Sequence, residues 1–286
     1  MMEWMIYGAN GYTGQLMVEE ALKRGFRPVL AGRSRESIEP LAQKYGLPAR
    51  VFTLDKHDAV LMGLRGMELV LHCAGPFSKT AAPMLKACLE SGAHYLDITG
   101  EIDVFAHCHG LDAEAKQRGI VVLPGAGFDV VPTDCLSAIL KLELPTAQNL
   151  VLAFDAPGGP SPGTAKTAVE GLGKGGCARI NGEMTKVPLA WKTRTFQKNG
   201  EQRLAMTIPW GDVYTAYIST GIPNIEVYMS VPPKTVDTLR RIRRLGPLLG
   251  FSPVQKFLKS QVTKKVRGPS EEARKDGETW VWGEVS

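Results

Sequence analysis

The segment Ile6-Tyr7-Gly8-Ala9-Asn10-Gly11-Tyr12-Thr13-Gly14-Gln15-Leu16 joins a short apolar run to a stretch with helical periodicity. Gly8, Gly11 and Gly14 have a G-x-x-G-x-x-G spacing, a variant of the pattern of dinucleotide-binding turns. In such a turn, glycines permit the tight bend, let the backbone approach a pyrophosphate and let helix and strand pack closely. The N-terminus of the following helix offers N–H groups to phosphate oxygens. The segment therefore predicts a dinucleotide-binding turn, with a tight turn that binds nothing as the alternative.

Outward from this turn, short apolar runs alternate with helix-like stretches. Runs such as 69–71 and 120–123 are apolar without alternation, as in strands buried on both faces. The helix-like stretches end at Gly25, Gly46 and Gly92, and glycine commonly follows a helix C-terminus. We predict an α/β fold, a Rossmann-type doubly wound parallel sheet covered by helices. The expected strands are 3–7, 28–31, 50–54, 68–73, 94–98 and 120–123, and the expected helices are 13–24, 36–45 and 80–91.

The pattern changes after Pro124. One more helix is expected over residues 132–141, capped by Thr133 or Asp134, and longer strand-like segments follow. Long strands in succession predict a mainly antiparallel sheet and hence an α+β second domain. We therefore expect a dinucleotide-binding domain over residues 1–130 and a substrate or dimerisation domain over residues 131–286. The strand-like segments of the second domain are 149–155, 203–208, 225–231 and 279–285.

The second expected strand ends at Gly32, and Arg33-Ser34-Arg35 follows. A carboxylate at this place would bind the ribose 2′-hydroxyl of NAD, whereas arginines beside a small hydroxyl suit the 2′-phosphate of NADP. The first carboxylate after the strand is Glu36. We therefore predict NADP rather than NAD, with a solvated basic turn as the alternative. Asp55, after the third strand, either faces the adenine or caps a helix.

Composition excludes several classes of protein. Apolar residues make up 44% and charged residues 22% of the 286, which is ordinary for a globular protein. Residues 1–4 lack a basic region and no apolar run approaches ~18 residues, so we expect neither a signal peptide nor a membrane-spanning helix. Five cysteines without a CxxC pair indicate reduced thiols and a cytoplasmic location. No metal site is expected, because adjacent residues in His107-Cys108-His109 point apart on a helix.

Basic residues are concentrated in one segment. Between residues 231 and 268 ten Lys or Arg stand against a single acidic residue, Asp237, and the rest of the chain is net acidic. An apolar stripe at helical spacing accompanies four arginines; it consists of Leu239, Ile242, Leu245, Leu248 and Leu249. The favoured interpretation is a helix packed on its own domain. The alternative is peripheral membrane contact through residues 239–265. No recognition motif supports nucleic-acid binding.

Four further motifs stand in order after the glycine turn. They are Val29-Leu30-Ala31-Gly32-Arg33, Leu71-His72-Cys73-Ala74-Gly75-Pro76-Phe77, Tyr95-Leu96-Asp97-Ile98-Thr99-Gly100-Glu101 and Gly127-Phe128-Asp129-Val130-Val131-Pro132-Thr133-Asp134. Together they resemble the saccharopine dehydrogenase-like oxidoreductases, a group that includes the trans-acting enoyl reductases of lipid biosynthesis. The resemblance is dense over residues 5–135 and thinner beyond, where 161–164 also fits. His72 stands where the family is expected to have Asn.

The resemblance implies an oxidoreductase fold with a bound nicotinamide cofactor. The residues expected around its adenine-side phosphates and ribose are Gly8, Asn10, Gly11, Tyr12, Thr13, Arg33 and Ser34, with Gly14 completing the turn. Ala74, Gly75 and Pro76 are expected on the nicotinamide side. The chain ends at Ser286, sooner than expected for the family. The last strand pattern, 280–282, is therefore expected either to lack partners or to belong with a further segment.

Catalysis cannot follow the Tyr-x-x-x-Lys scheme, because none of the seven tyrosines has Lys four residues on. Asp97 and Asp129 are the candidates for catalysis, since carboxylates at the carboxyl edge of a parallel sheet face the cleft. The alternative is that they anchor loop N–H groups. Thr99 is expected to cap the next helix. The loop 158–164 could bind a substrate carboxylate or thioester oxygen.

Two functions follow from these observations. The first is an NADP-dependent oxidoreductase that reduces a carbonyl, imine or enoyl group of a lipid-like or amino-acid-derived substrate. We favour a lipid-like substrate, because the cleft motifs lack the clustered arginines that two carboxylate-bearing partners need. The alternative is a non-catalytic NADP-binding protein, membrane-associated or regulatory. A homodimer is expected in either case.

Overall fold

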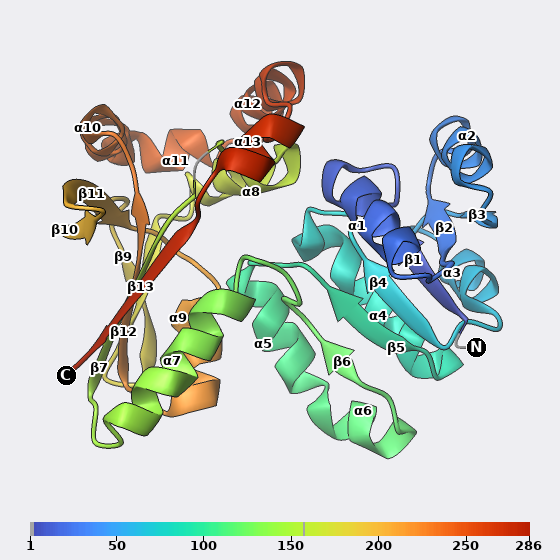
Figure 1. Ribbon diagram of the computed structural model, residues 1–286, viewed down its shortest axis with the longest axis horizontal. Coiled ribbons are helices and arrows are strands. Elements are labelled where there is room, and N and C mark those ends of the chain that lie inside the picture. The colour runs from blue at the N-terminus through green and yellow to red at the C-terminus, as the bar shows by residue number, and fades with distance from the viewer. Residues whose placement is uncertain (1–2, 157) are drawn as a thin grey trace. The chain divides into compact units, whose positions relative to one another are not determined.

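Short apolar runs between turn residues form the strands of the first part of the chain. The computed structural model describes residues 3–156 and 158–286, and the chain divides into a first unit, residues 1–128, and a second unit, residues 129–286 (Figure 1). The strands of the first unit are β1 (Trp4–Tyr7), β2 (Val29–Gly32), β3 (Ala49–Val51), β4 (Leu69–His72), β5 (His94–Asp97) and β6 (Val122–Leu123). Its helices are α1 (Tyr12–Lys23), α2 (Arg35–Tyr45), α3 (His57–Leu64), α4 (Phe77–Ser91), α5 (Ile102–Gly110) and α6 (Asp112–Arg118).

The six strands pair in parallel in the order β3-β2-β1-β4-β5-β6. Alternate residues of β1 enter two separate cores: Ile6 packs with α1 and α2, and Met5 packs with α3, α4 and α5. Helices therefore cover both faces of the sheet, which is the predicted doubly wound arrangement. Gly46 and Gly92 end their helices in the left-handed conformation, as their positions in the sequence indicate.

The second unit is built on a seven-stranded sheet. Its strands are β7 (Asn149–Asp155), β8 (Gly176–Ile180), β9 (Glu183–Val187), β10 (Thr193–Lys198), β11 (Glu201–Thr207), β12 (Asn224–Ser230) and β13 (Trp280–Val285). Its helices are α7 (Val131–Glu143), α8 (Pro162–Gly171), α9 (Asp212–Thr220), α10 (Pro233–Ile242), the 3₁₀ turn η1 (Arg243–Leu245), α11 (Gly246–Leu249), α12 (Ser252–Lys265) and α13 (Glu271–Asp276). Among the pairings of the described residues in this second sheet, only that of β7 with β12 is parallel, so the sheet is mainly antiparallel, as predicted.

Helices α7 and α9 cover one face of this sheet (Figure 1). α7 lies close on β13, because a Cβ at Gly283 would come within 2.4 Å of Leu140. The other face carries a row of aromatic rings, in which Phe196 contacts Tyr228 and Trp282. β13 pairs with β7 along its whole length, so the expectation that the last strand lacks partners is wrong.

Several element boundaries differ from the prediction. α7 begins at Val131 after Val130, so Thr133 and Asp134 lie within its first turn and neither is its cap. Pro132 explains the earlier start, because its fixed φ suits the first positions of a helix. α4 begins three residues before the expected helix 80–91, and β6 covers only half of the run 120–123. The strands β8, β9 and β10 were not predicted.

Candidate dinucleotide site

The predicted cofactor-binding residues of β1, β2 and β4 follow three adjacent strands at one edge of the first sheet. β1 lies at the centre of the order β3-β2-β1-β4-β5-β6, where the direction of winding reverses between β1 and β4. In open parallel sheets, ligands bind beyond the carboxyl ends of the strands at this reversal. The turn after β1, the arginine loop after β2 and the loop after β4 therefore meet where a dinucleotide is expected.

Each glycine of the turn after β1 has a distinct packing constraint. Gly8 has a φ of +85°, and a Cβ there would lie 2.8 Å from the backbone nitrogen of Ala74, in the loop after β4. A Cβ at Gly14 would lie 2.2 Å from the carbonyl oxygen of Gly8, so only glycine lets α1 approach β1 this closely. Gly11 is exposed, and a Cβ there would meet only the Gly8 carbonyl, at 3.2 Å. Gly8 and Gly14 thus shape the turn, and Gly11 presents its outer surface.

The N-terminus of α1 has no carboxylate of its own. Its N-cap residue, Gly11, supplies no side-chain acceptor, and its first turn contains no acidic residue. The starts of the two neighbouring helices differ. Glu36 lies in the first turn of α2, and both oxygens of Glu101 accept hydrogen bonds from the first N–H groups of α4, on Phe77 and Ser78, at 2.8 and 2.9 Å. Of these three helix starts, α1 is the one suited to a pyrophosphate.

Arg33 is exposed at the end of β2 and has no hydrogen-bond or ion-pair partner among the described residues. Arg35, two residues on, is paired with Glu39 along α2. The Ser34 hydroxyl donates to Glu36 at 2.9 Å and lies 3.1 Å from the Ser37 hydroxyl. Sequence reasoning could not separate the two arginines. The structure leaves Arg33 as the guanidinium available for a 2′-phosphate.

The remaining adenine-side candidates lie on the same edge. Asn10 lies beside the end of β2, because its Oδ1 is 3.3 Å from a Cβ built on Gly32. Tyr12 and Thr13 are half-buried in the first turn of α1. Asp55 is exposed, and a hydrogen bond from the Thr53 hydroxyl lowers the pKa of its carboxyl. Asp55 does not cap α3, whose N-cap residue is Lys56, so that alternative is wrong.

The hydroxyl group of a single threonine holds the backbone of the loop after β4 in place. Thr80 donates to the carbonyl of Ala74 at 2.7 Å and lies 3.1 Å from that of Pro76. Gly75 is exposed between them, and the Gly75–Pro76 bond is cis. The backbone of residues 74–76 is therefore fixed against Gly8 on one side and against α4 on the other. This arrangement fits the expected nicotinamide-side wall.

His72, at the end of β4, differs from the Asn expected there and is completely buried. Its ring lies among those of Tyr7, Phe77 and Tyr95, with centroids 5.4 to 6.1 Å away. Neither ring nitrogen has a hydrogen-bond partner among the described residues. Burial lowers the pKa of His72 to about 3, so the ring is neutral and serves as packing.

The structure favours the anchoring role for Asp97. Its carboxylate is completely buried and accepts hydrogen bonds from the backbone N–H groups of Thr99 and Gly125, at 2.9 and 2.8 Å, and from the Tyr95 hydroxyl at 2.6 Å. Burial raises the pKa of Asp97, and these bonds oppose the shift. Thr99 does not cap α5, whose N-cap residue is Glu101; its hydroxyl accepts from the Glu101 N–H instead.

Asp129 belongs to a group of carboxylates in the second unit. Burial raises its pKa to about 6, and among the described residues the Trp210 indole, which donates to the backbone carbonyl of Asp129, is its one hydrogen-bond partner. Asp212 is fully buried at the start of α9, and neither of its oxygens receives a well-formed hydrogen bond from the described residues. Burial raises the pKa of Asp212 to about 8, an effect that the nearby Thr133 hydroxyl reduces and the charge of Asp134 increases. Sequence reasoning missed Asp212, because a carboxylate before a helix usually indicates a cap.

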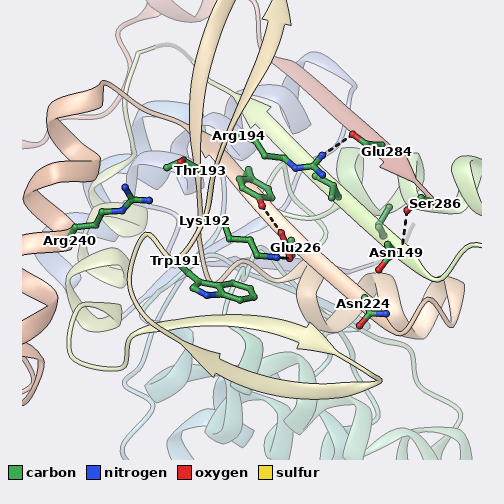
Figure 2. A pocket seen from close by; sticks show the side chains of 13 residues that line it. Asn149, Trp191, Lys192, Thr193, Arg194, Asn224, Glu226, Arg240, Glu284 and Ser286 are labelled. Carbon is green, nitrogen blue, oxygen red and sulfur yellow. Dashed lines mark hydrogen bonds and ion pairs between the residues drawn. The ribbon is translucent and has the colours of Figure 1, made fainter.

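A hollow of about 570 Å³ lies on the sheet of the second unit (Figure 2). Charged side chains line it, but they are paired with one another: Lys192 with Glu226, and Arg194 with Glu284 at 2.8 Å.

The loop 158–164 leads into α8, where the Ser161 hydroxyl accepts a hydrogen bond from the Thr164 N–H at 3.2 Å. Its predicted contact with a substrate stays a prediction.

No cluster of three or more His, Cys, Asp or Glu in residues 3–156 and 158–286 could hold a metal ion. None of the helices in the described part of the chain has both the length and the apolar character needed to cross a bilayer.

The sheet order, the glycine turn and the uncapped start of α1 define the first unit as a dinucleotide-binding domain of the Rossmann type. Residues 4–123 match the family model of the saccharopine dehydrogenase NADP binding domain. The resemblance inferred from the sequence is thus confirmed. NADP, the cofactor that the family description names, agrees with the prediction from Arg33.

The similarity to individual known proteins extends beyond these residues. The saccharopine dehydrogenase-like oxidoreductase of Homo sapiens is 28% identical over 197 residues, 59% of this chain and 46% of that protein. The trans-acting enoyl reductase of Mycobacterium bovis (strain BCG / Pasteur 1173P2) is 31% identical over 138 residues, 46% of this chain and 33% of that protein. The matched regions span less than half of these relatives. Saccharopine dehydrogenase (L-Glu forming) from Saccharomyces cerevisiae has a TM-score of 0.65 at 11% identity, over 96% of this chain and 70% of that one, which shows the shared fold.

Proposed function

We propose that the protein is an NADP(H)-dependent oxidoreductase that reduces a carbonyl, imine or enoyl group of a lipid-like substrate. The observation that carries the proposal is the pairing of an uncapped α1 start with an unpartnered Arg33, within a domain of the NADP-binding family. The N–H groups of α1 would bind the pyrophosphate, and Arg33 the 2′-phosphate. When bound, NADPH supplies the hydride. The protein's own residues therefore have to position the substrate against the cofactor and to exclude water from the site.

Asp129 is our candidate for the proton donor. Its carboxylate accepts no hydrogen bond from the described residues, and its pKa of about 6 is close to the range that general acids need. Asp129→Asn should lower kcat by a factor of about 10² to 10⁴, the usual contribution of such a group. The dissociation constant for NADPH should stay unchanged, because Asp129 lies outside residues 4–123. A decrease of less than threefold in kcat would remove Asp129 from this role.

The substrate class rests on two supports. The first is the relative named trans-acting enoyl reductase, and the second is the absence of clustered arginines from the cleft motifs. The test begins with NADPH fluorescence titration and continues with NADPH oxidation in the presence of an enoyl thioester, a long-chain ketone or a keto acid with an amine. Turnover with the enoyl thioester or the ketone supports the proposal. Turnover only with the keto acid and amine would assign an amino-acid-derived substrate instead.

A second candidate is a non-catalytic NADP-binding protein. It is favoured by one observation: Asp97, one of the two catalytic candidates, is fully used by hydrogen bonds inside the first unit. Tight NADPH binding without oxidation of NADPH by any of the three substrate classes would favour this candidate.

A further inference from the structure

Four large apolar side chains are exposed within thirteen consecutive residues of the second unit, from 245 to 257. The exposed fractions are 52% for Leu245, 57% for Leu248, 59% for Phe251 and 62% for Phe257. The prediction that this stripe is core is therefore wrong for Leu245 and Leu248. Among the described apolar side chains of residues 231–268, only that of Val236, earlier on α10, is buried. The stripe thus leaves the core where α10 gives way to η1 and α11.

Cations accompany these apolar side chains. Arg244, Leu245 and Leu248 lie three, four and seven residues after Arg241 through α10, η1 and α11, so the four share one side of this helical stretch. A hollow of about 370 Å³ beside them is lined by Asp237, Arg240, Arg241, Arg243 and Arg244. Four guanidinium groups around one carboxylate give this surface a strong positive charge.

α12 repeats the arrangement. Phe257 and Lys264 are seven residues apart and therefore lie on the same side of the helix, with exposed Lys256 beside them. The side toward α8 is fixed: Gln255 donates to the carbonyl of Val169 at 2.9 Å, and Lys259 is paired with Glu170. Because these contacts hold α12, the exposure of Phe257 does not come from an undocked helix.

These elements lie together at one end of the second unit's sheet (Figure 1). From the exposed apolar side chains and the surrounding cations, we propose that residues 240–265 form a membrane-docking surface for a bilayer that contains anionic phospholipids. Leu245, Leu248, Phe251 and Phe257 insert into the interface, and the arginines contact lipid phosphates. The charge argues for a membrane rather than a second copy of the chain, because two such surfaces would repel each other.

The test is co-sedimentation of the full chain with vesicles of phosphatidylcholine alone or mixed with phosphatidylserine. The protein should bind only the mixed vesicles, and added salt should weaken binding. Replacing Arg241, Arg243 and Arg244 with Gln should weaken it roughly a hundredfold, since each basic residue contributes about fivefold. Replacing Leu245, Leu248 and Phe257 with Ser should also release the protein, while NADPH titration shows that the first unit stays folded.

Matched control variants use surfaces elsewhere on the chain. Leu142→Ser with Ile139→Ser removes exposed apolar side chains from α7, and Lys23→Gln with Lys44→Gln removes exposed cations from α1 and α2. These variants should bind vesicles as the unaltered protein does. Three outcomes would overturn the proposal: no binding to mixed vesicles at low salt, equal loss in test and control variants, or a dimer in solution that Leu245→Ser converts to a monomer.

Discussion

Arg33 and Arg35 differ in what their guanidinium groups contact. Arg35 is held by Glu39, whereas Arg33 has no partner among the described residues. NADPH should bind at least tenfold more tightly than NADH, about 1.4 kcal/mol, because only NADPH carries a 2′-phosphate. Arg33→Ala should remove most of this preference, and Arg35→Ala should leave it intact. Calorimetric titration measures both affinities, and equal binding of the two cofactors by the unaltered protein would refute the assignment.

Asp212 makes stability depend on pH. Because burial raises its pKa to about 8, the folded state keeps a proton that the unfolded state releases above its ordinary value near 4. The contribution of Asp212 to the free energy of unfolding should therefore fall as the pH rises from about 4 to about 8, by up to roughly 1.4 kcal/mol per pH unit. Asp212→Asn should flatten this slope, as urea denaturation at several pH values can measure. Asp112→Asn, at an exposed carboxylate, is the control; an unchanged slope in Asp212→Asn would contradict the prediction.

At the scale of elements, local sequence signals identified the strands with mostly apolar runs and missed the polar ones. The central parallel strands β1, β2 and β4 are mostly apolar, so their existence follows from the pattern. β9 and β10 are short, polar and half-exposed, and their periodicity is weak. A signal was nevertheless present: Asn181-Gly182 and Asn199-Gly200, with positive φ at both residues, join β8 to β9 and β10 to β11. Asn-Gly is the strongest short-range sign of a hairpin.

In the glycine turn, the structure separates the roles of Gly11 and Gly14, which the sequence alone does not. Gly11→Val should abolish NADPH binding with little loss of stability, because Gly11 has an ordinary φ of −72° and its surface faces solvent. Gly14→Val should unfold the first unit or displace α1, since its Cβ would overlap the Gly8 carbonyl. Circular dichroism and NADPH titration on both variants separate the two effects. NADPH binding retained by Gly11→Val would place the pyrophosphate elsewhere.

The parts of the candidate site that could be predicted are those whose backbone conformation is determined by a sequence motif. The turn and the position of Arg33 follow from spacing, whereas the loop after β4 was implied by the resemblance. The state of each side chain does not, because it depends on contacts that the motifs do not specify: Arg35 is paired with Glu39, and Asp97 accepts hydrogen bonds from loop N–H groups. The same holds for Asp212, whose burial arises from the packing of α7 and α9.

For the whole molecule, His72 and Asp212 limit stability from opposite sides of the pH scale. His72 has its folded pKa lowered to about 3 from an ordinary value near 6.5, so the stability it allows is lost as the pH falls between these values. Asp212 acts in the other direction, from about 4 to about 8. Together they predict maximal stability on the acid side of neutrality, between about pH 4 and pH 6.5.

Thermal unfolding across pH 3–9 measures this profile. His72→Leu should raise the melting temperature mainly below pH 6, and Asp212→Asn mainly above it. His72 lies in the first unit and Asp212 in the second. If both variants change the profile at the same pH, the assignment of each limb to one residue is wrong.

The carboxylate of Glu101 at the start of α4 also bears on how a cofactor can be oriented. A dinucleotide is nearly symmetric about its pyrophosphate, so a sheet edge with several equivalent helix starts could hold it in more than one frame. Glu101 fills one start and Glu36 lies in another, and both make these starts less suited to the pyrophosphate than that of α1. The chain's own carboxylates therefore occupy two of the three helix starts at this edge. A dinucleotide can then bind with its pyrophosphate at the remaining start, that of α1, and in one orientation only.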